Sequence, residues 1–168
     1  MSIAPMHDVV VRRLLRPGDT KAIADLHDRV YSAEYGLDGR FRASVARGLE
    51  DALHEGWPER SGAVWLIDGD GELRGSLGLT VAAEGIGQVR WFVLAPELRG
   101  RGLGRALVAE LVDEARAVGM RRLVLETFSA LTAAAHIYRG VGFRAVREQR
   151  TDMWGPAITY QQYELALD

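Results

Sequence analysis

A run of alternating glycines and arginines is the segment with the clearest chemical capacity. Gly100, Gly102 and Gly104 stand between a predicted buried strand and a predicted helix, with arginines at positions 99, 101 and 105. The first N–H groups of a helix lack backbone acceptors, and glycine lets phosphate oxygens approach them. The arginines add charge-assisted donors. Because glycine in a helical turn costs about 0.5–1 kcal/mol relative to alanine, the spacing favours a phosphate site over a simple tight turn.

The spacing also restricts which phosphate ligand could bind. A Walker loop needs a lysine after its last glycine, and the only lysine in the chain is Lys21. The dinucleotide pattern G-x-G-x-x-G would need glycine at Arg105, although Glu126 lies near the distance of a ribose-binding acid. A dinucleotide-binding oxidoreductase therefore stays an alternative, although only one short helix and two strands are predicted after Glu126.

The elements that must position this turn follow from apolar spacing and from breakers. A strand is predicted at residues 9–15, then a helix with a stripe of Ile23, Leu26 and Val30. A second helix at 41–55 carries apolar residues four apart, and its apolar positions are Phe41, Val45, Leu49 and Leu53. Two helices therefore precede the main sheet.

The rest of the chain alternates strands and helices. A hairpin, a buried strand that ends at Pro96 and a helix that ends at Gly119 lead to a strand around 123–125. A helix over 130–138 and two closing strands follow, and the predicted strands of this half are 63–67, 73–82, 89–95, 123–125, 143–146 and 158–167. The fold class is α/β (α+β), with helices packed on a mostly antiparallel sheet.

Length and composition set the outer limits. A chain of 168 residues and ordinary composition predicts one domain over residues 1–168, with residues 1–8 a flexible N-terminus. The absence of cysteine excludes thiolate nucleophiles and cysteine-based metal sites, and we expect no metal. A net charge of −2 offers no attraction to nucleic acid or an anionic membrane, and no leader or apolar span is seen. We expect a cytoplasmic protein.

Two motifs resemble those of the GNAT superfamily of N-acetyltransferases. The run Arg99-x-x-Gly102-x-Gly104 after Leu94-x-Pro96 resembles motif A, and the segment from Tyr138 to Phe143 resembles motif B. The segments 31–36, 91–94 and 126–128 look most like the acetyltransferase domain that is fused to MarR-type regulators. This resemblance covers nearly the whole chain and implies a GNAT fold, with a mixed, mostly antiparallel sheet of about 6–7 strands, helices on both faces and splayed central strands.

The resemblance implies acetyl-CoA as the acyl donor. Backbone groups of Phe92, Val93 and Leu94 would pair with the pantetheine arm at the splay. The pyrophosphate would be held by the segment that runs through Arg99, Gly100, Arg101, Gly102, Leu103, Gly104 and Arg105. Many members have an asparagine seven residues before the motif B tyrosine, where this chain has Leu131, so that contact would be lost or replaced.

Acid and base candidates follow from the same resemblance. An alkylammonium of pKa about 10.4 loses its proton at pH 7 only at a cost near 4.6 kcal/mol, so a base should collect that proton. Glu126 matches a general base in ribosomal-protein acetyltransferases, or else pairs with an arginine such as Arg122. Glu34 is a second candidate beside the acceptor pocket, and Trp154 would line that pocket or anchor its loop. Tyr138 would contact the cofactor and protonate the CoA thiolate, or else pack in the core.

We therefore expect an N-acetyltransferase (EC 2.3.1 class) acting by direct attack in a ternary complex. The acceptor would be a small-molecule amine or a peptide N-terminus, and a homodimer is compatible with the sequence. A non-catalytic acyl-CoA sensor stays open as a second function. We expect no direct nucleic-acid or membrane partner.

Overall fold

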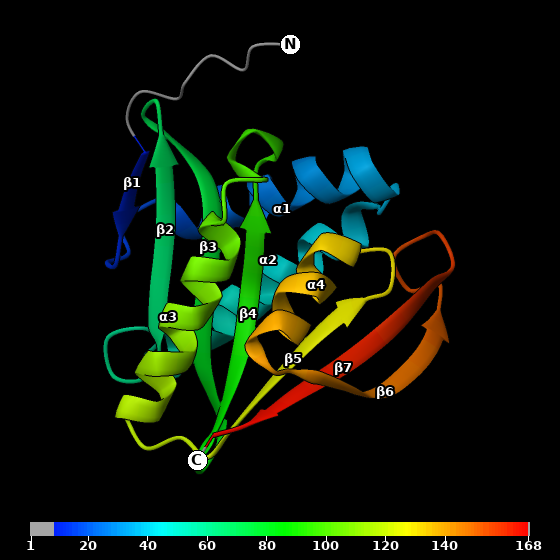
Figure 1. Ribbon diagram of the computed structural model, residues 1–168. Helices are drawn as coiled ribbons and strands as arrows, with labels where there is room; N and C mark the ends of the chain where they lie inside the picture. Colours follow the sequence, from blue (N-terminus) through cyan, green and yellow to red (C-terminus); the bar gives the residue numbers. More distant parts are fainter. Residues whose placement is uncertain (1–8, 168) are drawn as a thin grey trace.

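The computed structural model describes residues 9–167, so the predicted flexible segment 1–8 lies outside the described residues. Seven strands form one sheet in the order β1-β2-β3-β4-β5-β7-β6 (Figure 1). The strands are β1 (Val9–Arg12), β2 (Ala63–Gly69), β3 (Glu72–Ala83), β4 (Ile86–Leu94), β5 (Arg122–Phe128), β6 (Arg144–Thr151) and β7 (Ile158–Ala166). Every adjacent pair is antiparallel except β4 and β5. The predicted mixed, mostly antiparallel sheet is confirmed.

Helices cover both faces of the sheet. One face carries α1 (Asp19–Tyr35) and α2 (Gly39–His54), and the other carries α3 (Leu103–Ala117) and α4 (Thr132–Val141) (Figure 1). A short 3-10 turn, η1 (Pro96–Leu98), joins β4 to the glycine-rich segment. A single parallel crossover within the described chain, β4-α3-β5, lacks the repeated crossovers of a dinucleotide-binding fold, and this counts against the oxidoreductase alternative.

Two apolar clusters form the core, one on each side of the sheet. The α3 and α4 side is built around Trp65, Leu111 and Tyr163, all fully buried. The α1 and α2 side contains the predicted stripe of Ile23, Leu26 and Val30. None of the helices within residues 9–167 combines the length and apolarity needed to cross a lipid bilayer.

The predicted stripe of α2 is wrong at its last position. Phe41, Val45 and Leu49 are buried, but Leu53 is 42% exposed and Ala52 takes its place in the core. A strict four-residue spacing drifts around a helix of 3.6 residues per turn, so the third step leaves the buried face. Gly119, by contrast, follows α3 in the left-handed conformation predicted for a helix end, with φ 85°.

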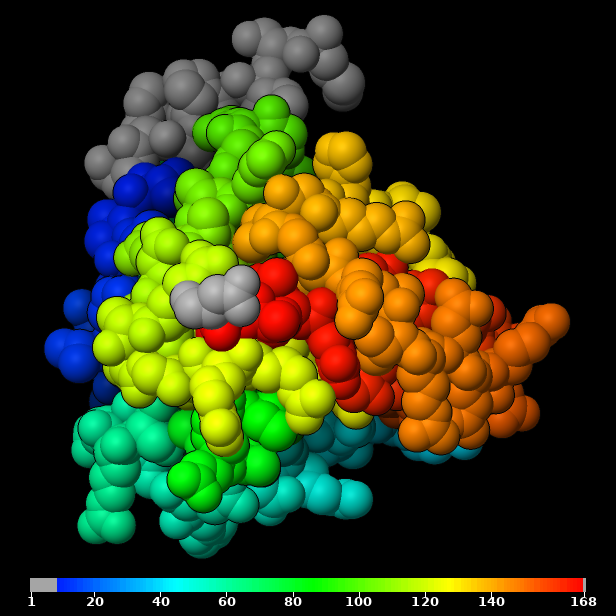
Figure 2. Space-filling model, turned by 60° about the horizontal axis from the view of Figure 1, so that its bottom comes forward, coloured from blue at the N-terminus to red at the C-terminus, as the bar shows by residue number. Residues whose placement is uncertain are grey.

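One end of the sheet is closed by the connection after α3. The Arg121 N–H donates to the carbonyl of Gly85 at 2.8 Å, and the Leu167 N–H donates to the carbonyl of Arg121 at 2.8 Å. The β3-β4 turn, the α3-β5 connection and the end of β7 consequently lie side by side (Figure 2). The opposite ends of β4 and β5 are free to separate.

Candidate active site

The glycine-rich turn presents a set of unpaired backbone donors. Gly100 and Gly102 both have φ 77°, a left-handed conformation that a side chain rarely adopts. Within the described chain, the N–H groups of residues 100–105 have no backbone or side-chain acceptor, and the first N–H that bonds back to this turn is that of Ala106, to Gly102. Six donors therefore surround the N-terminus of α3, which suits an oxyanion.

Gly104 has a different role from the other two glycines. A Cβ at this position would lie 3.0 Å from Ile137 Cδ1 and 3.2 Å from both Leu94 Cδ1 and Phe92 Cζ. Its φ is not positive, whereas Cβ atoms at Gly100 and Gly102 would meet nothing within 4 Å. Gly104 thus lets α3 pack closely on β4 and α4, and the other two glycines let the turn form.

The three arginines of the turn are not equivalent. Arg99 donates through Nε to the carbonyl of Leu94 at 3.1 Å, and its guanidinium forms a bidentate ion pair with Glu34. Arg101 and Arg105 are exposed and form no ion pair within residues 9–167. Arg99 fixes the turn, while Arg101 and Arg105 are free to meet an incoming anion.

The central strands separate beyond the midpoint of the sheet. Parallel pairing between β4 and β5 runs only from Ile86 and Arg122 to Val89 and Leu125. A bulge follows in β4, where Trp91 has φ 52° and its carbonyl accepts a 2.6 Å hydrogen bond from the Ser76 hydroxyl. The edge of β4 that faces β5 has no strand partner there within residues 9–167, which is the predicted splay.

The segment Phe92, Val93 and Leu94 lies along this free edge. Val93 and Leu94 pair with β3 on the other side, and Leu94 is opposite Gly75. The Phe92 carbonyl accepts a hydrogen bond from the Tyr31 hydroxyl at 3.2 Å. Because the Phe92 carbonyl already accepts this hydrogen bond from α1, a ligand at the splay would bond to other backbone groups of the segment.

Two cavities adjoin at the splay. The larger, of about 220 Å³, lies on the α1 and α2 side, and the smaller, of about 100 Å³, extends to Arg99 of the glycine-rich turn. Both are lined by Tyr31, Phe92, Leu131 and Ala134. An elongated ligand could therefore run from the turn, past Leu131, into the larger cavity.

The predicted acid and base residues both line the larger cavity. Tyr138 is buried, its hydroxyl forms no hydrogen bond within residues 9–167, and burial raises its pKa above the ordinary value. Glu126 is exposed at the cavity wall. Arg122, its suggested ion-pair partner, lies instead 3.9 Å from Glu164.

Glu34 and Trp154 lie differently with respect to this cavity. Glu34 lines neither cavity, and its hydrogen bonds with Arg99 lower its pKa. Trp154 lines the larger cavity and packs edge-on against Phe41, with ring centroids 5.1 Å apart. Its carbonyl also accepts a 3.0 Å hydrogen bond from the Asp38 N–H, so the residue forms a cavity wall and anchors its loop at once.

The acetyltransferase (GNAT) family model matches residues 22–143, which span both the glycine-rich turn and Tyr138. The chain belongs to this family.

Individual relatives agree with that assignment. The uncharacterized N-acetyltransferase YjgM of Escherichia coli is 32% identical over 148 residues, covering 86% of this chain and 87% of YjgM. A mycothiol acetyltransferase of Cellulomonas flavigena is 30% identical, with 88% of this chain and 43% of that protein covered. The chain thus spans under half of that longer relative.

A solved acetyl-CoA complex shares the fold. The structure of yncA from Salmonella typhimurium, determined with its cofactor acetyl-CoA, has a TM-score of 0.71 and 19% identity, with 96% of this chain and 95% of that chain covered. At 19% identity, this similarity shows a shared fold and nothing about the activity.

Several polar residues that line the larger cavity were not predicted as site residues, and His27, Arg90 and Tyr160 are among them. His27 lines the larger cavity from α1, and its Nδ1 lies 2.8 Å from the Ile23 carbonyl. Burial lowers the pKa of His27 to about 4, so the ring is neutral at pH 7. His136 of α4, by contrast, is exposed.

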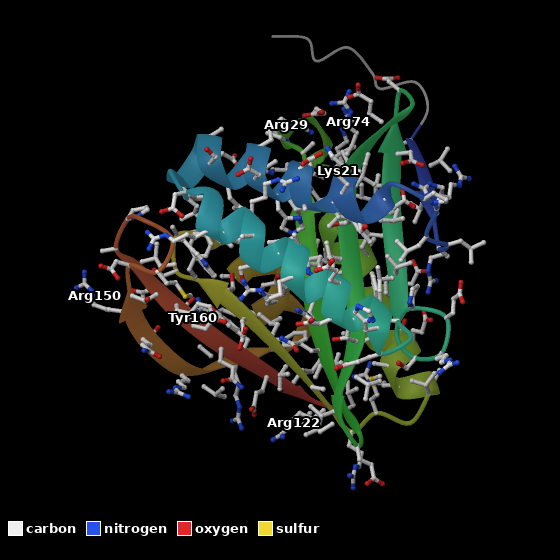
Figure 3. All side chains as sticks on the ribbon, turned by 180° about the vertical axis from the view of Figure 1, so that it is seen from behind. Lys21, Arg29, Arg74, Arg122, Arg150 and Tyr160 are labelled. Carbon is white, nitrogen blue, oxygen red and sulfur yellow. The ribbon has the colours of Figure 1, made fainter. Side chains whose placement is uncertain are left out.

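Tyr160 comes from β7 and Arg90 from β4. Figure 3 shows this side of the sheet, with α1 and α2 in front and Tyr160 on β7 beside them. Burial and the neighbouring Glu126 carboxylate raise the pKa of Tyr160. In the predicted strand 89–95, Arg90 is the single polar residue, and this is the signal that the sequence offers for it.

Proposed function

We propose that this protein is an N-acetyltransferase that transfers the acetyl group of acetyl-CoA directly to a primary amine. The observation that carries the proposal is that Glu126 and Tyr138 line one cavity at the splayed strands, and that this cavity adjoins a smaller one that reaches Arg99 of the glycine-rich turn. Family membership and the acetyl-CoA complex of yncA support the choice of donor.

Residues suited to each part of acetyl-CoA follow one another from the glycine-rich turn to the larger cavity. The free N–H groups of residues 100–105 would bind the pyrophosphate, with Arg101 and Arg105 adding charge. The pantetheine would extend along the free edge of β4 at Phe92 to Leu94, through the smaller cavity. The apolar Leu131 side chain there offers packing where many members offer an amide.

The chemistry at the end of that path uses two side chains. Glu126 accepts a proton from the acceptor amine, directly or through water, as the nitrogen bonds to the thioester carbonyl carbon. The C–S bond then breaks, and the departing thiolate takes the proton of the Tyr138 hydroxyl. Burial keeps that hydroxyl protonated at neutral pH, so it is available as a donor. The chain contains no cysteine, so no acetyl-cysteine can form, and this supports direct attack with both substrates bound together.

The proposal extends to the acceptor class and to close relatives. The acceptor would be a small-molecule amine or a peptide N-terminus, in keeping with the family. We also retain the closer resemblance to acetyltransferase domains that are fused to MarR-type regulators, which rests on segments 31–36, 91–94 and 126–128. A cytoplasmic location and a homodimer belong to the same proposal.

The proposal is tested by binding and by turnover. Calorimetry should show acetyl-CoA binding, and a chromogenic thiol reagent should show CoA release that requires an added primary amine. The protein contributes no thiol of its own, so the assay has no protein background. Mass spectrometry should find the N-acetyl product and no acylated protein. Binding of acetyl-CoA without thiol release from any amine would instead establish the non-catalytic sensor.

A further inference from the structure

Within residues 9–167, Arg90 is the one arginine or lysine that lines the larger cavity. Its guanidinium is half-buried and lies 4.3 Å from the centroid of the Trp91 ring. It forms no ion pair or side-chain hydrogen bond within the described chain, and burial lowers its pKa. Arg12, which is also shielded, is paired with both Asp19 and Asp68. Because a partly desolvated cation is unfavourable without an anion, Arg90 is suited to an anion from outside the chain.

A glycine in α2 makes room for this guanidinium. Gly48 is in the interior of the helix, where glycine costs about 0.5–1 kcal/mol relative to alanine. A Cβ at Gly48 would overlap Arg90 Nη2 and approach Trp91 Cζ2 to 3.8 Å. The helix therefore carries a less favourable residue where a side chain would displace Arg90 from its place.

The larger cavity presents opposite charges together with aromatic walls. Glu126 and Arg90 both line it, and Glu126 is the carboxylate with the largest electrostatic effect on Arg90. Phe41, Trp154 and Tyr160 supply flat apolar surface. His27 is neutral at pH 7 and adds no charge. A small molecule that bears both an amine and a carboxylate would match this arrangement.

We propose that the acceptor is a small amino acid whose carboxylate is bound by Arg90 while its amine faces Glu126. This inference rests on the proposed N-acetyltransferase function and narrows it. A guanidinium and a carboxylate form short, charge-assisted hydrogen bonds, which fix the orientation of the acceptor. A peptide N-terminus, which lacks the adjacent carboxylate, would leave Arg90 unpaired.

The test compares matched acceptors and matched variants. Free amino acids and their C-terminal amides would be assayed with the wild-type protein, Arg90→Met, Gly48→Ala and the control Arg47→Met, whose arginine is exposed beside Gly48. The wild type should prefer the acid form over the amide by about 100-fold in kcat/KM, since a desolvated charge pair is lost with the amide. Arg90→Met should remove that preference, mainly through a higher KM for the acid form, so that acid and amide are used with similar kcat/KM. Gly48→Ala should weaken the preference while the charge is kept, and Arg47→Met should match the wild type.

The outcomes separate this inference from the proposed function. Equal turnover of acids and amides, unchanged by Arg90→Met, would overturn the amino-acid assignment and leave the acetyltransferase intact. If no amine is acetylated, the proposed function fails, and calorimetry with the CoA-loaded protein still decides the role of Arg90. Binding of the acid form that Arg90→Met abolishes would support an anion site, and equal binding of acid and amide would reject it.

Discussion

Glu34 of α1 and Arg99 of the glycine-rich turn form a bidentate ion pair, with Arg99 Nη2 donating to Glu34 Oε2 at 2.8 Å. The pair joins the last part of α1 to the segment that leads into α3. Tyr31 and Tyr35, from the same part of α1, line the smaller cavity together with Arg99. The ion pair therefore ties one wall of the proposed pantetheine path to the proposed phosphate site.

Glu34→Gln should weaken acetyl-CoA binding by up to about fivefold and leave the turnover rate nearly unchanged. The pair is partly exposed, and such pairs contribute at most about 1 kcal/mol. Steady-state kinetics with both substrates would measure the effect, with the exposed Glu59→Gln as control. If turnover instead fell by two orders of magnitude or more, the general base would be Glu34.

Glu126→Gln should lower kcat/KM for the amine by 10²–10⁴-fold at pH 7, the usual contribution of a general base. The deficit should shrink as pH rises toward the amine pKa of about 10.4, because the free amine then arrives already deprotonated. The matched control is Glu164→Gln on β7, whose carboxylate lies near Arg122. A rate ratio that stays constant with pH would contradict the role of Glu126 as base.

Tyr138→Phe should slow turnover at least tenfold while acetyl-CoA binding and folding are retained. The hydroxyl forms no hydrogen bond within residues 9–167, so its loss leaves no donor or acceptor unsatisfied in the free protein. Single-turnover kinetics would measure the chemical step. Unchanged turnover would show that water or another group protonates the thiolate.

Tyr163→Phe is the matched control for Tyr138→Phe, because it should change the stability of the protein and leave the turnover rate unchanged. Tyr163 is fully buried, and its hydroxyl has no hydrogen-bond partner in the described chain. An unsatisfied buried hydroxyl costs about 1–3 kcal/mol, so its removal should raise the free energy of unfolding by about 1 kcal/mol. Urea denaturation would measure this gain, and the turnover rate should not change. A loss of stability would point to a bound water on this hydroxyl.

His27 should make the protein less stable in mild acid. Its pKa is about 4 when folded and 6.5 in the unfolded reference, so the unfolded chain binds more protons between these pH values. Stability should therefore fall by about 3 kcal/mol from this residue as pH drops from 7 to 4. Urea titrations across that range should show a shallower loss for His27→Gln than for the wild type. The exposed His136→Gln should keep the wild-type slope, and parallel slopes for all three proteins would refute the assignment.

Local sequence patterns were sufficient to predict the helices and strands and to propose a phosphate site at the glycine-rich turn. These depend on local physics: apolar periodicity selects helix or strand, and Gly100 and Gly102 favour backbone conformations that other residues resist. Tyr138 and Glu126 could be proposed because each lies within a recognisable segment. Glycine spacing did not separate the packing role of Gly104 from the conformational role of its neighbours, since close approach to Ile137 exists only after folding.

Which polar groups share the cavity depends on the packing of distant elements and could not be predicted from the sequence. His27, Arg90, Glu126 and Tyr160 come from four separate elements, and no spacing in the chain relates them. The β4 bulge and the early end of β4-β5 pairing open the cavity between them. The structure likewise paired Glu34 with Arg99, because an ion pair across 65 positions depends on how α1 crosses the sheet. Charge partners and cavity walls arise from contacts between residues that are distant in the sequence. For this protein, these contacts underlie the proposal for the acceptor.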